Sequence, residues 1–185
     1  MPTILITGAG RGIGRELARQ YAADGWRVIG TVRAPSEHLA EAIELDVTDA
    51  VQVKALGARL KGVPIDVLFC NAGIIGKRGN RFGSFDYADW EQILRVNLLG
   101  AAAVIEALAD NVAASQRKVI CVMSSRLGLI SQTTGETLPY STSKAALNLL
   151  AKGLAATQGL RLVIAGLQPG HSGQFFSHDG SIIPW

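Results

Sequence analysis

The chain contains a tyrosine and a lysine whose spacing could support acid–base chemistry. Tyr140 and Lys144 are four residues apart in a segment with helical periodicity, so on a helix they lie one turn apart on the same face. A free phenol has a pKa of about 10 and exchanges protons poorly at neutral pH. A nearby ammonium group, or the positive ring of an oxidised nicotinamide, favours the phenolate, so Tyr140 is predicted to be a general acid or base.

Glycines form a second group of interest, in the run that follows the first apolar segment. The run Gly8–Gly14 comes directly after Thr7 and before a helical pattern that starts at Arg15. Glycines let a backbone turn tightly and approach a pyrophosphate, whose charge then lies at a helix N-terminus. Because Ile13 stands at the third glycine position of the common G-x-G-x-x-G fingerprint, the run reads T-G-x-x-x-G-x-G instead. A tight strand-to-helix turn without a ligand is the alternative interpretation.

Short apolar runs and amphipathic segments alternate along the chain and must position these motifs. The strand candidates, rich in Val, Ile and Leu, are Thr3–Thr7, Arg27–Thr31, Ala42–Leu45, Ile65–Cys70, Lys118–Met123 and Arg161–Leu167. The helix candidates between them are Gly12–Asp24, Asp49–Leu60, Tyr87–Asn111 and Leu138–Thr157. Continuous apolar strands separated by helices predict an α/β fold, a doubly wound parallel β-sheet with helices on both faces. We expect residues 1–185 to form a single Rossmann-type domain.

The order of the motifs resembles that of the short-chain dehydrogenase/reductase family. Beside the glycine run, the chain has an N-A-G triplet after the fourth predicted strand, a helical asparagine, a serine pair after the fifth strand and a Y-x-x-x-K pair. A P-G dipeptide follows the sixth strand, so the resemblance runs from Thr3 to Gly170. The matching residues are Asn71-Ala72-Gly73, Asn97, Ser124-Ser125, Tyr140, Lys144 and Pro169-Gly170.

The resemblance implies a catalytic role for four side chains. Tyr140 is expected to exchange a proton with the substrate oxygen, and Lys144 to bind the hydroxyls of the nicotinamide ribose as well. Ser125 is expected to bind the substrate oxygen, with Ser124 as the alternative. Asn97 is expected to hold a water that links Lys144 to solvent. Without the resemblance, the serine pair is typical of turn chemistry and Asn97 of a satisfied buried amide.

The resemblance also implies where the cofactor lies. Asp46, at the end of the third predicted strand, is expected to accept a hydrogen bond from the adenine amino group, and Asn71-Ala72-Gly73 to shield the adenine side. Pro169-Gly170 is expected beside the nicotinamide. The full set of expected cofactor contacts is Gly8, Gly10, Arg11, Gly12, Ile13, Gly14, Arg33, Asp46, Val47, Asn71, Ala72, Gly73, Tyr140, Lys144, Pro169 and Gly170.

The end of the second predicted strand favours NADP(H) over NAD(H). An acidic residue there would bind the adenosine ribose diol and select NAD, but the segment Arg27–Arg33 contains no Asp or Glu. Arg33 and, in the glycine run, Arg11 are suited to a 2′-phosphate, because a guanidinium matches phosphate geometry in a bidentate manner. The alternative, in which one or both arginines are solvated surface residues, keeps NAD(H) possible.

Composition and patterning exclude other classes of protein. The 185 residues carry 18 basic and 15 acidic side chains, a net charge of +3, with no basic run, so no nucleic-acid partner is expected. No uncharged apolar stretch reaches the roughly 18 residues of a membrane span, and no signal peptide precedes the first strand, which predicts a cytoplasmic protein without a membrane partner.

His38, His171 and His178 lack metal-ligand spacing, so no metal is expected. Cys70 and Cys121 are expected to be reduced and buried.

These features together predict an oxidoreductase that transfers a hydride between the nicotinamide cofactor and a small ketone, aldehyde or secondary alcohol. The C-terminal residues Ser172–Phe176 and Pro184-Trp185 resemble the tails of small C-factor-like carbonyl reductases. A nucleotide-binding signalling or regulatory protein with little or no turnover is the alternative. Family members oligomerise through the helices that Tyr87–Asn111 and Leu138–Thr157 match, so a homodimer or homotetramer is expected by resemblance.

The spacing near the C-terminus predicts that part of the domain is missing. Gln174–Ser177 reads as a seventh strand, and only the six residues Gln168–Gly173 separate it from the sixth. A parallel neighbour needs a crossover of about a dozen residues or more, and in the family a substrate lid lies here. We therefore expect a few dozen lid residues to be absent between Gly170 and Ser172, either left out of this sequence or removed by a natural or engineered deletion.

Overall fold

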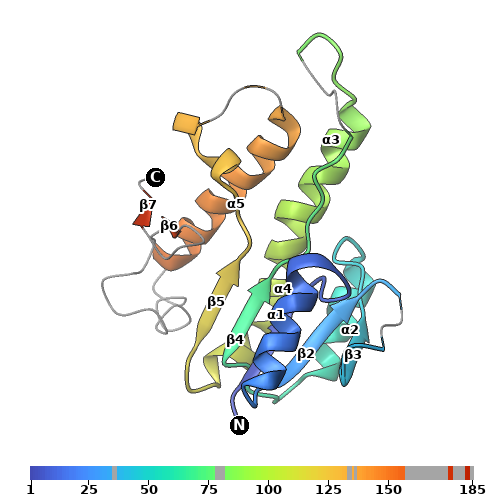
Figure 1. The fold of residues 1–185 in the computed structure, drawn as a ribbon, viewed down its shortest axis with the longest axis vertical. Helices are drawn as coiled ribbons and strands as arrows, with labels where there is room; N and C mark the ends of the chain where they lie inside the picture. The colour runs from blue at the N-terminus through green and yellow to red at the C-terminus, as the bar shows by residue number, and fades with distance from the viewer. Residues whose placement is uncertain are drawn as a thin grey trace.

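The main sheet is open and parallel, with helices on both faces, as the sequence predicts (Figure 1). The computed structural model describes residues 1–34, 37–77, 82–132, 135, 137–156, 175–176 and 182–183. The strand order is β3-β2-β1-β4-β5, and every pair is parallel. The five strands are β1 (Thr3–Ile6), β2 (Arg27–Val32), β3 (Glu41–Glu44), β4 (Val67–Cys70) and β5 (Val119–Val122).

Two of the helices begin at aspartates that cap them. The helices are α1 (Gly12–Ala23), α2 (Ala50–Arg59), α3 (Tyr87–Leu94), α4 (Ala101–Ala113) and α5 (Leu138–Ala156). Before α2, the Asp49 carboxylate accepts hydrogen bonds from the N–H groups of Val51 at 2.8 Å and Gln52 at 3.1 Å. Before α3, Asp86 accepts one from the Asp89 N–H at 3.1 Å. A carboxylate at this position satisfies N–H groups that have no partner within the helix, which explains where both helices start.

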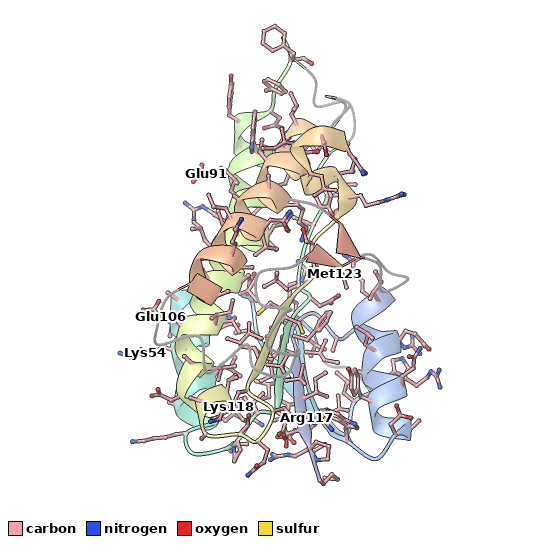
Figure 2. The ribbon with its side chains drawn as sticks, turned by 90° about the vertical axis from the view of Figure 1, so that its left-hand side faces the viewer. Lys54, Glu91, Glu106, Arg117, Lys118 and Met123 are labelled. Carbon is pink, nitrogen blue, oxygen red and sulfur yellow. The ribbon has the colours of Figure 1, made fainter. Side chains whose placement is uncertain are left out.

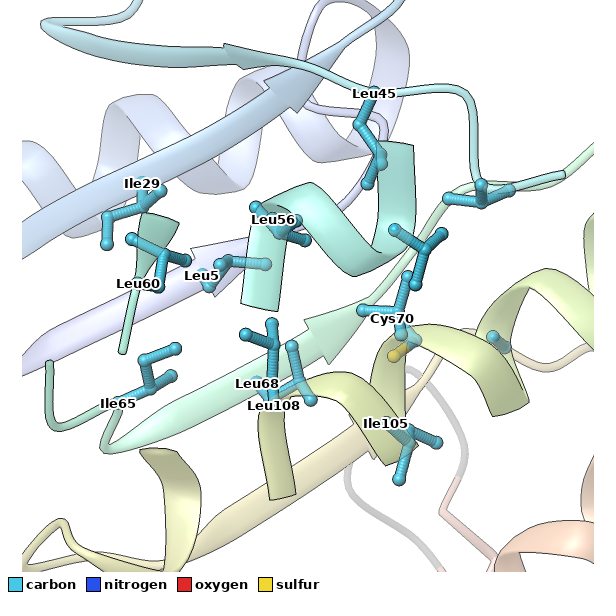
Figure 3. Packing of buried hydrophobic residues seen from close by; sticks show 14 of the residues in the cluster. Leu5, Ile29, Leu45, Leu56, Leu60, Ile65, Leu68, Cys70, Ile105 and Leu108 are labelled. Carbon is cyan, nitrogen blue, oxygen red and sulfur yellow. The ribbon is translucent and has the colours of Figure 1, made fainter. Parts of the chain in front are cut away.

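Alternate side chains of the central strands enter two separate hydrophobic layers. Leu5 of β1 and Leu68 of β4 are fully buried in the layer that contains Leu56 of α2 and Leu108 of α4 (Figure 3). Ile4 of β1 lies in the smaller layer with residues of α1. Figure 2 shows α1 on one side of the sheet and α2 with α4 on the other. Since successive strand residues point to opposite faces, a sheet covered on both sides needs the continuous apolar runs that the sequence contains.

The carboxyl edge of the sheet opens where the strand order reverses, between β1 and its two neighbours. β1 is hydrogen-bonded to β2 on one side and to β4 on the other, so the loops that follow β1 and β4 diverge at the carboxyl edge of the sheet. In open α/β sheets, ligands bind at this point. The glycine run follows β1 and the N-A-G triplet follows β4, so the topology brings these two motifs to the same edge.

The helix predicted over Tyr87–Asn111 changes its winding in the middle. α3 passes into a π-helical segment, Arg95–Gly100, and α4 then continues to Ala113. Gly100 lies close to the loop after β3, because a Cβ built on it would be 2.6 Å from Val47 Cγ2. Turns of this kind are rare and often occur at functional sites, and this one contains Asn97.

The same continuous helix, Tyr87–Ala113, is long and apolar enough to cross a membrane by length and composition alone, with a mean hydropathy of 1.5 in its most apolar stretch. Its residues Val104, Ile105 and Leu108 are buried in the layer beneath the sheet. Within the structure, 39% of that stretch is buried. The core helix of a globular protein passes the same test, so a single helix of this kind is only a weak indication of a membrane span.

The C-terminal strands differ from the prediction. Phe175–Phe176 (β6) pairs antiparallel with Ile182–Ile183 (β7) in a separate two-stranded sheet. The prediction of a short strand within Gln174–Ser177 is therefore confirmed at Phe175–Phe176, and its partner among the described residues is antiparallel. The predicted sixth strand Arg161–Leu167 and the segment 168–174, where the missing lid is expected, lie outside the described residues.

Both cysteines are free thiols, as predicted. Cys70 is buried, whereas Cys121 is partly exposed. Burial raises the pKa of Cys70 to about 12 and the pKa of Cys121 to about 11. Because the thiolate is the reactive form, neither side chain is a nucleophile at neutral pH. Within the described ranges, no group of three or more His, Cys, Asp or Glu side chains is placed to hold a metal ion.

Candidate active site

The glycine run after β1 leaves open space in front of the N-terminus of α1. Gly12 has a φ of +55°, and no atom lies within 4 Å of a Cβ built on it. Gly14 is tightly packed instead, since a Cβ there would be 2.5 Å from the carbonyl oxygen of Gly8 and from Asn71 Nδ2. Only glycine fits on the packed side. The open side lies where the first N–H groups of a helix bind an anion, so the run fits a pyrophosphate.

Asn71 joins the ends of β1 and β4. Its Nδ2 donates to the carbonyl oxygens of Thr7 at 2.9 Å and Gly8 at 3.2 Å. In return, Thr7 Oγ1 accepts hydrogen bonds from the N–H groups of Asn71 and Ala72, both at 3.0 Å. These four contacts hold the N-A-G triplet against the glycine run, so the two sequence motifs form one rigid surface.

A cleft of about 1070 Å³ runs along this edge of the sheet, from the end of β2 to α5. The sequence-predicted residues that line it are Gly8, Gly10, Arg11, Gly12, Ile13, Arg33, Asp46, Val47, Asn71, Ala72, Gly73, Tyr140 and Lys144. Gly14 is not on its wall, because it packs behind the turn against Gly8 and Asn71. Pro169 and Gly170 lie outside the described residues. The expected nucleotide contacts and the Tyr–Lys pair therefore share one extended cleft, which suits a dinucleotide.

Charged side chains gather at the β2 end of the cleft. Asp46 Oδ1 accepts hydrogen bonds from the Thr48 N–H at 2.9 Å and the Thr48 hydroxyl at 2.7 Å, and these lower the pKa of its carboxyl group, with a smaller contribution from the charge of Arg33. Arg11 and Arg33 are exposed on the wall. No ion pair holds either guanidinium among the residues that the structure describes, so both can turn toward a ligand.

Asn97 ties the π-helical segment to two other elements. Only 1% of its surface is exposed. Its Oδ1 accepts from the Ile74 N–H at 2.8 Å, and its Nδ2 donates to the Ile74 carbonyl at 2.9 Å and to Ser143 Oγ at 3.0 Å. Both amide hydrogens are used by the protein, so a relay water at Asn97 would have to be held by an oxygen of that residue. The structure brings Asn97 to α5, as expected, and gives it the buried-amide role as well.

Lys144 extends from α5 into the cleft as a buried cation. The residue is 3% exposed, and its Nζ donates to the Met123 carbonyl oxygen at 2.7 Å. A Cβ built on Gly73 would be in ordinary contact with Nζ at 3.6 Å but would lie only 3.2 Å from Asn97 Oδ1, so the glycine of the N-A-G triplet leaves room for the Asn97 amide. Burial lowers the pKa of Lys144 to about 8. Nζ lies 5.7 Å from the centre of the Tyr140 ring, so the predicted pair does share one face of the helix.

Ser125, rather than Ser124, lies beside the tyrosine. Ser125 Oγ is close enough to the Tyr140 hydroxyl to lower the pKa of that group, and it accepts a hydrogen bond from the Leu127 N–H at 3.2 Å. Ser124 Oγ instead donates to Asn148 Oδ1 at 2.5 Å. Ser125 therefore has its hydroxyl where a substrate oxygen could contact both groups, whereas Ser124 binds α5.

The protonation of Tyr140 departs from the simple expectation. Burial raises the pKa of Tyr140, and the hydrogen bond with Ser125 lowers it only in part. The sequence predicts the opposite direction, on the ground that the Lys144 ammonium favours the phenolate. That prediction is wrong for the protein groups alone, because Nζ faces the ring and the Met123 carbonyl, and removal from water dominates. The second group expected to favour the phenolate is the positively charged ring of an oxidised nicotinamide, which would lower the pKa of Tyr140.

Several residues that sequence reasoning missed hold α5 in place. Ser143 is fully buried, accepts from Asn97 and donates to the Tyr140 carbonyl oxygen at 2.7 Å. Trp90 of α3 donates from Nε1 to Thr142 Oγ1 at 3.1 Å, so a second contact joins α3 to the first turns of α5. The available indication was the occurrence of polar residues next to Tyr140 and Lys144 in an otherwise apolar helix.

Comparisons with known proteins agree with this geometry. The family model of the short chain dehydrogenases matches residues 2–172. The chain belongs to the short chain dehydrogenase family. It is 30% identical over 230 aligned positions to 1-hydroxy-2-glutathionyl-2-methyl-3-butene dehydrogenase of a Rhodococcus strain, and the alignment covers 100% of both chains. It is 29% identical over 156 residues to C-signal of Myxococcus xanthus, which covers 66% of this chain and 93% of that one.

Among solved structures, a short-chain dehydrogenase/reductase from Burkholderia multivorans with bound NADP superposes with a TM-score of 0.79. It is 34% identical, and the superposition covers 88% of this chain and 75% of that chain. Family membership makes this protein an oxidoreductase that acts on small molecules with a nicotinamide cofactor of the NAD(P) type. The Rossmann-type fold predicted from the sequence is confirmed.

Proposed function

We propose that this protein is an NADP(H)-dependent reductase of small carbonyl compounds, with Tyr140 as its proton donor. The observation that carries the proposal is that Ser125 and the buried Lys144 both lie beside Tyr140, and that Tyr140 and Lys144 line the same cleft as the glycine run. Two hydroxyl groups converge there, and a third polar group carries a charge. This is the set that polarising and protonating a carbonyl oxygen requires.

Each side chain has a separate task in the proposed reaction. The bound cofactor supplies a hydride to the carbonyl carbon. Ser125 holds the carbonyl oxygen, and Tyr140 donates its hydroxyl proton to that oxygen. The raised pKa of Tyr140 keeps this proton in place at neutral pH. Lys144 faces the Tyr140 ring, and its ammonium group, which lines the cleft, would donate to the ribose hydroxyls of a bound cofactor. Asn97 holds α5 in position through its hydrogen bond to Ser143. By way of a water, it is also proposed to relay protons between solvent and Lys144.

NADP(H) is the proposed cofactor because Arg11 and Arg33 both line the β2 end of the cleft. The relative solved with NADP supports the same preference. In the Arg33→Asp variant we expect the ratio of kcat/KM with NADPH to that with NADH to fall by about tenfold or more, because a phosphate would meet a carboxylate instead of a guanidinium. An unchanged ratio would contradict the assignment.

The proposed substrates are small ketones, aldehydes or secondary alcohols, and the proposed subgroup is that of the C-factor-like carbonyl reductases. Similarity to C-signal supports the subgroup. A cytoplasmic location is part of the proposal, as is a homodimer or homotetramer built on the helices α3–α4 and α5. Leu99 and Leu149, on these helices, are 59% and 72% exposed, which is consistent with a contact between copies.

The missing lid also stays a proposal. The alignment with the Rhodococcus dehydrogenase spans 230 positions and both whole chains, more than the 185 residues present here. This supports the idea that a few dozen positions of the relative have no counterpart in this chain, and we propose that they fall between Gly170 and Ser172. Sequencing the gene and its transcript from the source would test it, since an uninterrupted reading frame through Gly170-His171-Ser172 would establish a true deletion.

The test of the proposed function is a panel of aldehydes, ketones and secondary alcohols with NADPH, NADH and their oxidised forms, followed by nicotinamide absorbance. We expect reduction of at least one carbonyl class with NADPH and almost none by the Tyr140→Phe variant. Cofactor binding without turnover of any compound would overturn the proposal and favour the alternative, a nucleotide-binding signalling or regulatory protein.

A further inference from the structure

The chain on both sides of Ser125 lies against the same residue of α5. Before the serine pair, the carbonyl oxygen of Met123, which is labelled in Figure 2, accepts a hydrogen bond from Lys144 Nζ at 2.7 Å. After the pair, Gly128 packs on the main chain of the same lysine. A Cβ built on Gly128 would be 2.9 Å from the carbonyl carbon and from the Cβ of Lys144. Lys144 therefore supports the segment that carries Ser125 at both of its ends.

The segment from Ser125 to Gly128 is a short turn closed by hydrogen bonds. The Gly128 N–H donates to the Ser125 carbonyl oxygen at 2.9 Å, and the Leu127 N–H donates to Ser125 Oγ at 3.2 Å. On the α5 side, Asn148 Nδ2 donates to the Gly128 carbonyl oxygen at 3.4 Å. Because Gly128 is bonded directly to the main chain of Ser125 within this turn, a displacement of Gly128 also displaces Ser125.

The packing at Gly128 leaves no room for a side chain. Carbon atoms in ordinary contact are about 3.5–4.0 Å apart, so a separation of 2.9 Å from Lys144 is too short. The main-chain nitrogen of Ala145 would also be only 3.1 Å from the new Cβ. These atoms belong to the body of a helix and cannot rotate aside as the end of a long side chain can. A methyl group at Gly128 would therefore move the turn away from α5 by about 1 Å.

We propose that Gly128 is a positioning residue, whose lack of a side chain sets the separation between the Ser125 hydroxyl on the turn and Tyr140 on α5. The inference rests on the proposed reductase function. Tyr140 lies one helical turn before Lys144, so the stretch of α5 on which Gly128 packs is the one that holds the tyrosine. The substrate oxygen must reach both hydroxyl groups, and a misplacement of about 1 Å can lower a rate by up to about 10²-fold. Gly128 acts through Ser125 and does not itself touch the substrate.

The test is a double-mutant cycle of Gly128→Ala and Ser125→Ala, with kcat measured by NADPH oxidation on a carbonyl substrate. In Gly128→Ala we expect kcat to fall by about tenfold or more. The Kd for NADPH should change less than about twofold, because Gly128 is not on the wall of the cleft. In the Ser125→Ala background the same substitution should change kcat less than about twofold, because the hydroxyl group that Gly128 positions is already absent. Losses that multiply in the double variant would overturn the proposal.

The pH dependence of alcohol oxidation with NADP⁺ gives a second readout, which a merely structural role would not change. Tyr140 must be deprotonated to act as the base, so kcat/KM rises with pH as this group loses its proton. The nearby Ser125 hydroxyl lowers the pKa of Tyr140, against the larger and opposite effect of burial. In Gly128→Ala the rise should therefore shift to higher pH, with no further shift in the double variant. An unchanged profile in Gly128→Ala would contradict the positioning role.

Gly153→Ala is the control from α5, because no atom lies within 4 Å of its new Cβ, and its kcat should equal that of the unaltered protein. If urea unfolding shows that Gly128→Ala does not fold, Asn148→Leu takes its place, since it removes the donor to the Gly128 carbonyl without adding bulk to the turn. We expect its kcat to fall by about three- to tenfold, and by less than about twofold in the Ser125→Ala background. Full kcat in Asn148→Leu would overturn the proposal.

Turnover by the unaltered protein separates this inference from the function on which it rests. If the unaltered protein reduces a carbonyl compound but the losses from Gly128→Ala and Ser125→Ala are independent, only the role of Gly128 is overturned. If the unaltered protein binds NADPH and reduces no carbonyl compound, the proposed function is overturned together with this inference.

Discussion

The two ends of the cleft are built in different ways. At the glycine run, the main chain sets the shape: Gly14 packs against the Gly8 carbonyl oxygen, and Asn71 binds backbone carbonyls of the neighbouring turn. At the other end, side chains set the chemistry, through the contacts of Asn97 with Ser143 and of Lys144 with the Met123 carbonyl. Substitutions at the first end should act through steric conflict and lost folding. Substitutions at the second end can remove activity while the fold stays intact.

The largest effect is expected at the catalytic end, in the Tyr140→Phe variant. Loss of the proton donor should lower kcat by about 10²–10⁴-fold, measured by NADPH oxidation with a carbonyl substrate. The phenyl ring fills the same volume, so the Kd for NADPH should change less than about twofold. Tyr87→Phe is the control, because Tyr87 is 73% exposed on α3 and should leave both values unchanged. A Tyr140→Phe variant that retains full kcat would remove the distinction between the two ends.

At the glycine run, Gly14→Ala should act on the fold itself. A methyl group 2.5 Å from the Gly8 carbonyl oxygen requires the turn to shift, at a cost of about 1–3 kcal/mol in the free energy of unfolding, and weakens NADPH binding in parallel. The control is Gly153→Ala in α5, where no atom lies within 4 Å of the new Cβ. That helical position should gain about 0.5–1 kcal/mol. Urea unfolding of the two variants should thus give opposite signs, and a loss at both positions would contradict the packing argument.

The two serines after β5 should differ in what their substitution changes, one affecting kcat and the other the free energy of unfolding. In Ser125→Ala we expect kcat to fall by about 10–100-fold, because the tyrosine loses its hydrogen-bond partner and the substrate oxygen loses a donor. In Ser124→Ala we expect kcat to change less than about threefold and the free energy of unfolding to fall by about 1 kcal/mol, because Asn148 Oδ1 loses its hydrogen-bond donor. The reverse pattern in kcat would assign the substrate contact to Ser124.

A smaller effect, with an unusual sign, is expected for the stability of Lys144→Met. Burial lowers the pKa of Lys144 from its ordinary value of 10.5 to about 8, so the unfolded chain binds more protons than the folded protein between these two pH values. Stability from this group therefore rises as the pH increases from 8 to 10.5, and the buried ammonium is a net cost below pH 8. At pH 7 the free energy of unfolding of Lys144→Met should exceed that of the unaltered protein by about 1–2 kcal/mol, although the variant loses activity.

Urea unfolding of the unaltered protein and of Lys144→Met at about pH 7 and about pH 10 checks this prediction. The advantage of the variant should shrink at the higher pH, where the unaltered lysine is neutral in the folded state. A variant that is less stable at pH 7 would show that the hydrogen bond to Met123 outweighs the cost of burial.

Local sequence patterns predicted most of the fold because each buried strand needs an uninterrupted apolar run. β4 begins at Val67 rather than at the predicted Ile65, although the main chain of Asp66 still bonds to both neighbouring strands, donating to the Thr3 carbonyl at 2.9 Å and accepting from the Val119 N–H at 3.1 Å. The π-helical segment could not be predicted, since it depends on how Asn97 and Gly100 meet other elements. The antiparallel pairing of Phe175–Phe176 has the same origin, because strand partners are chosen by tertiary contacts.

At the candidate site, the ordered motifs predicted which residues meet in the cleft, but not their electrostatics. Whether Ser124 or Ser125 faces Tyr140 depends on how β5 twists into the following turn, which spacing alone leaves open. The direction of the Tyr140 pKa depends on burial, a property of the folded protein and not of the Y-x-x-x-K spacing.

In the proposed reaction, the cleft brings a bound nicotinamide cofactor and a carbonyl substrate together at Tyr140. The most direct measurement follows deuterium from NADPH labelled at the nicotinamide carbon that donates hydride, with mass spectrometry of the alcohol product. We expect the product to gain deuterium with the unaltered protein, and we expect Tyr140→Phe, although it binds NADPH, to form almost no labelled product. An alcohol product without deuterium, or equal labelling by both proteins, would contradict it.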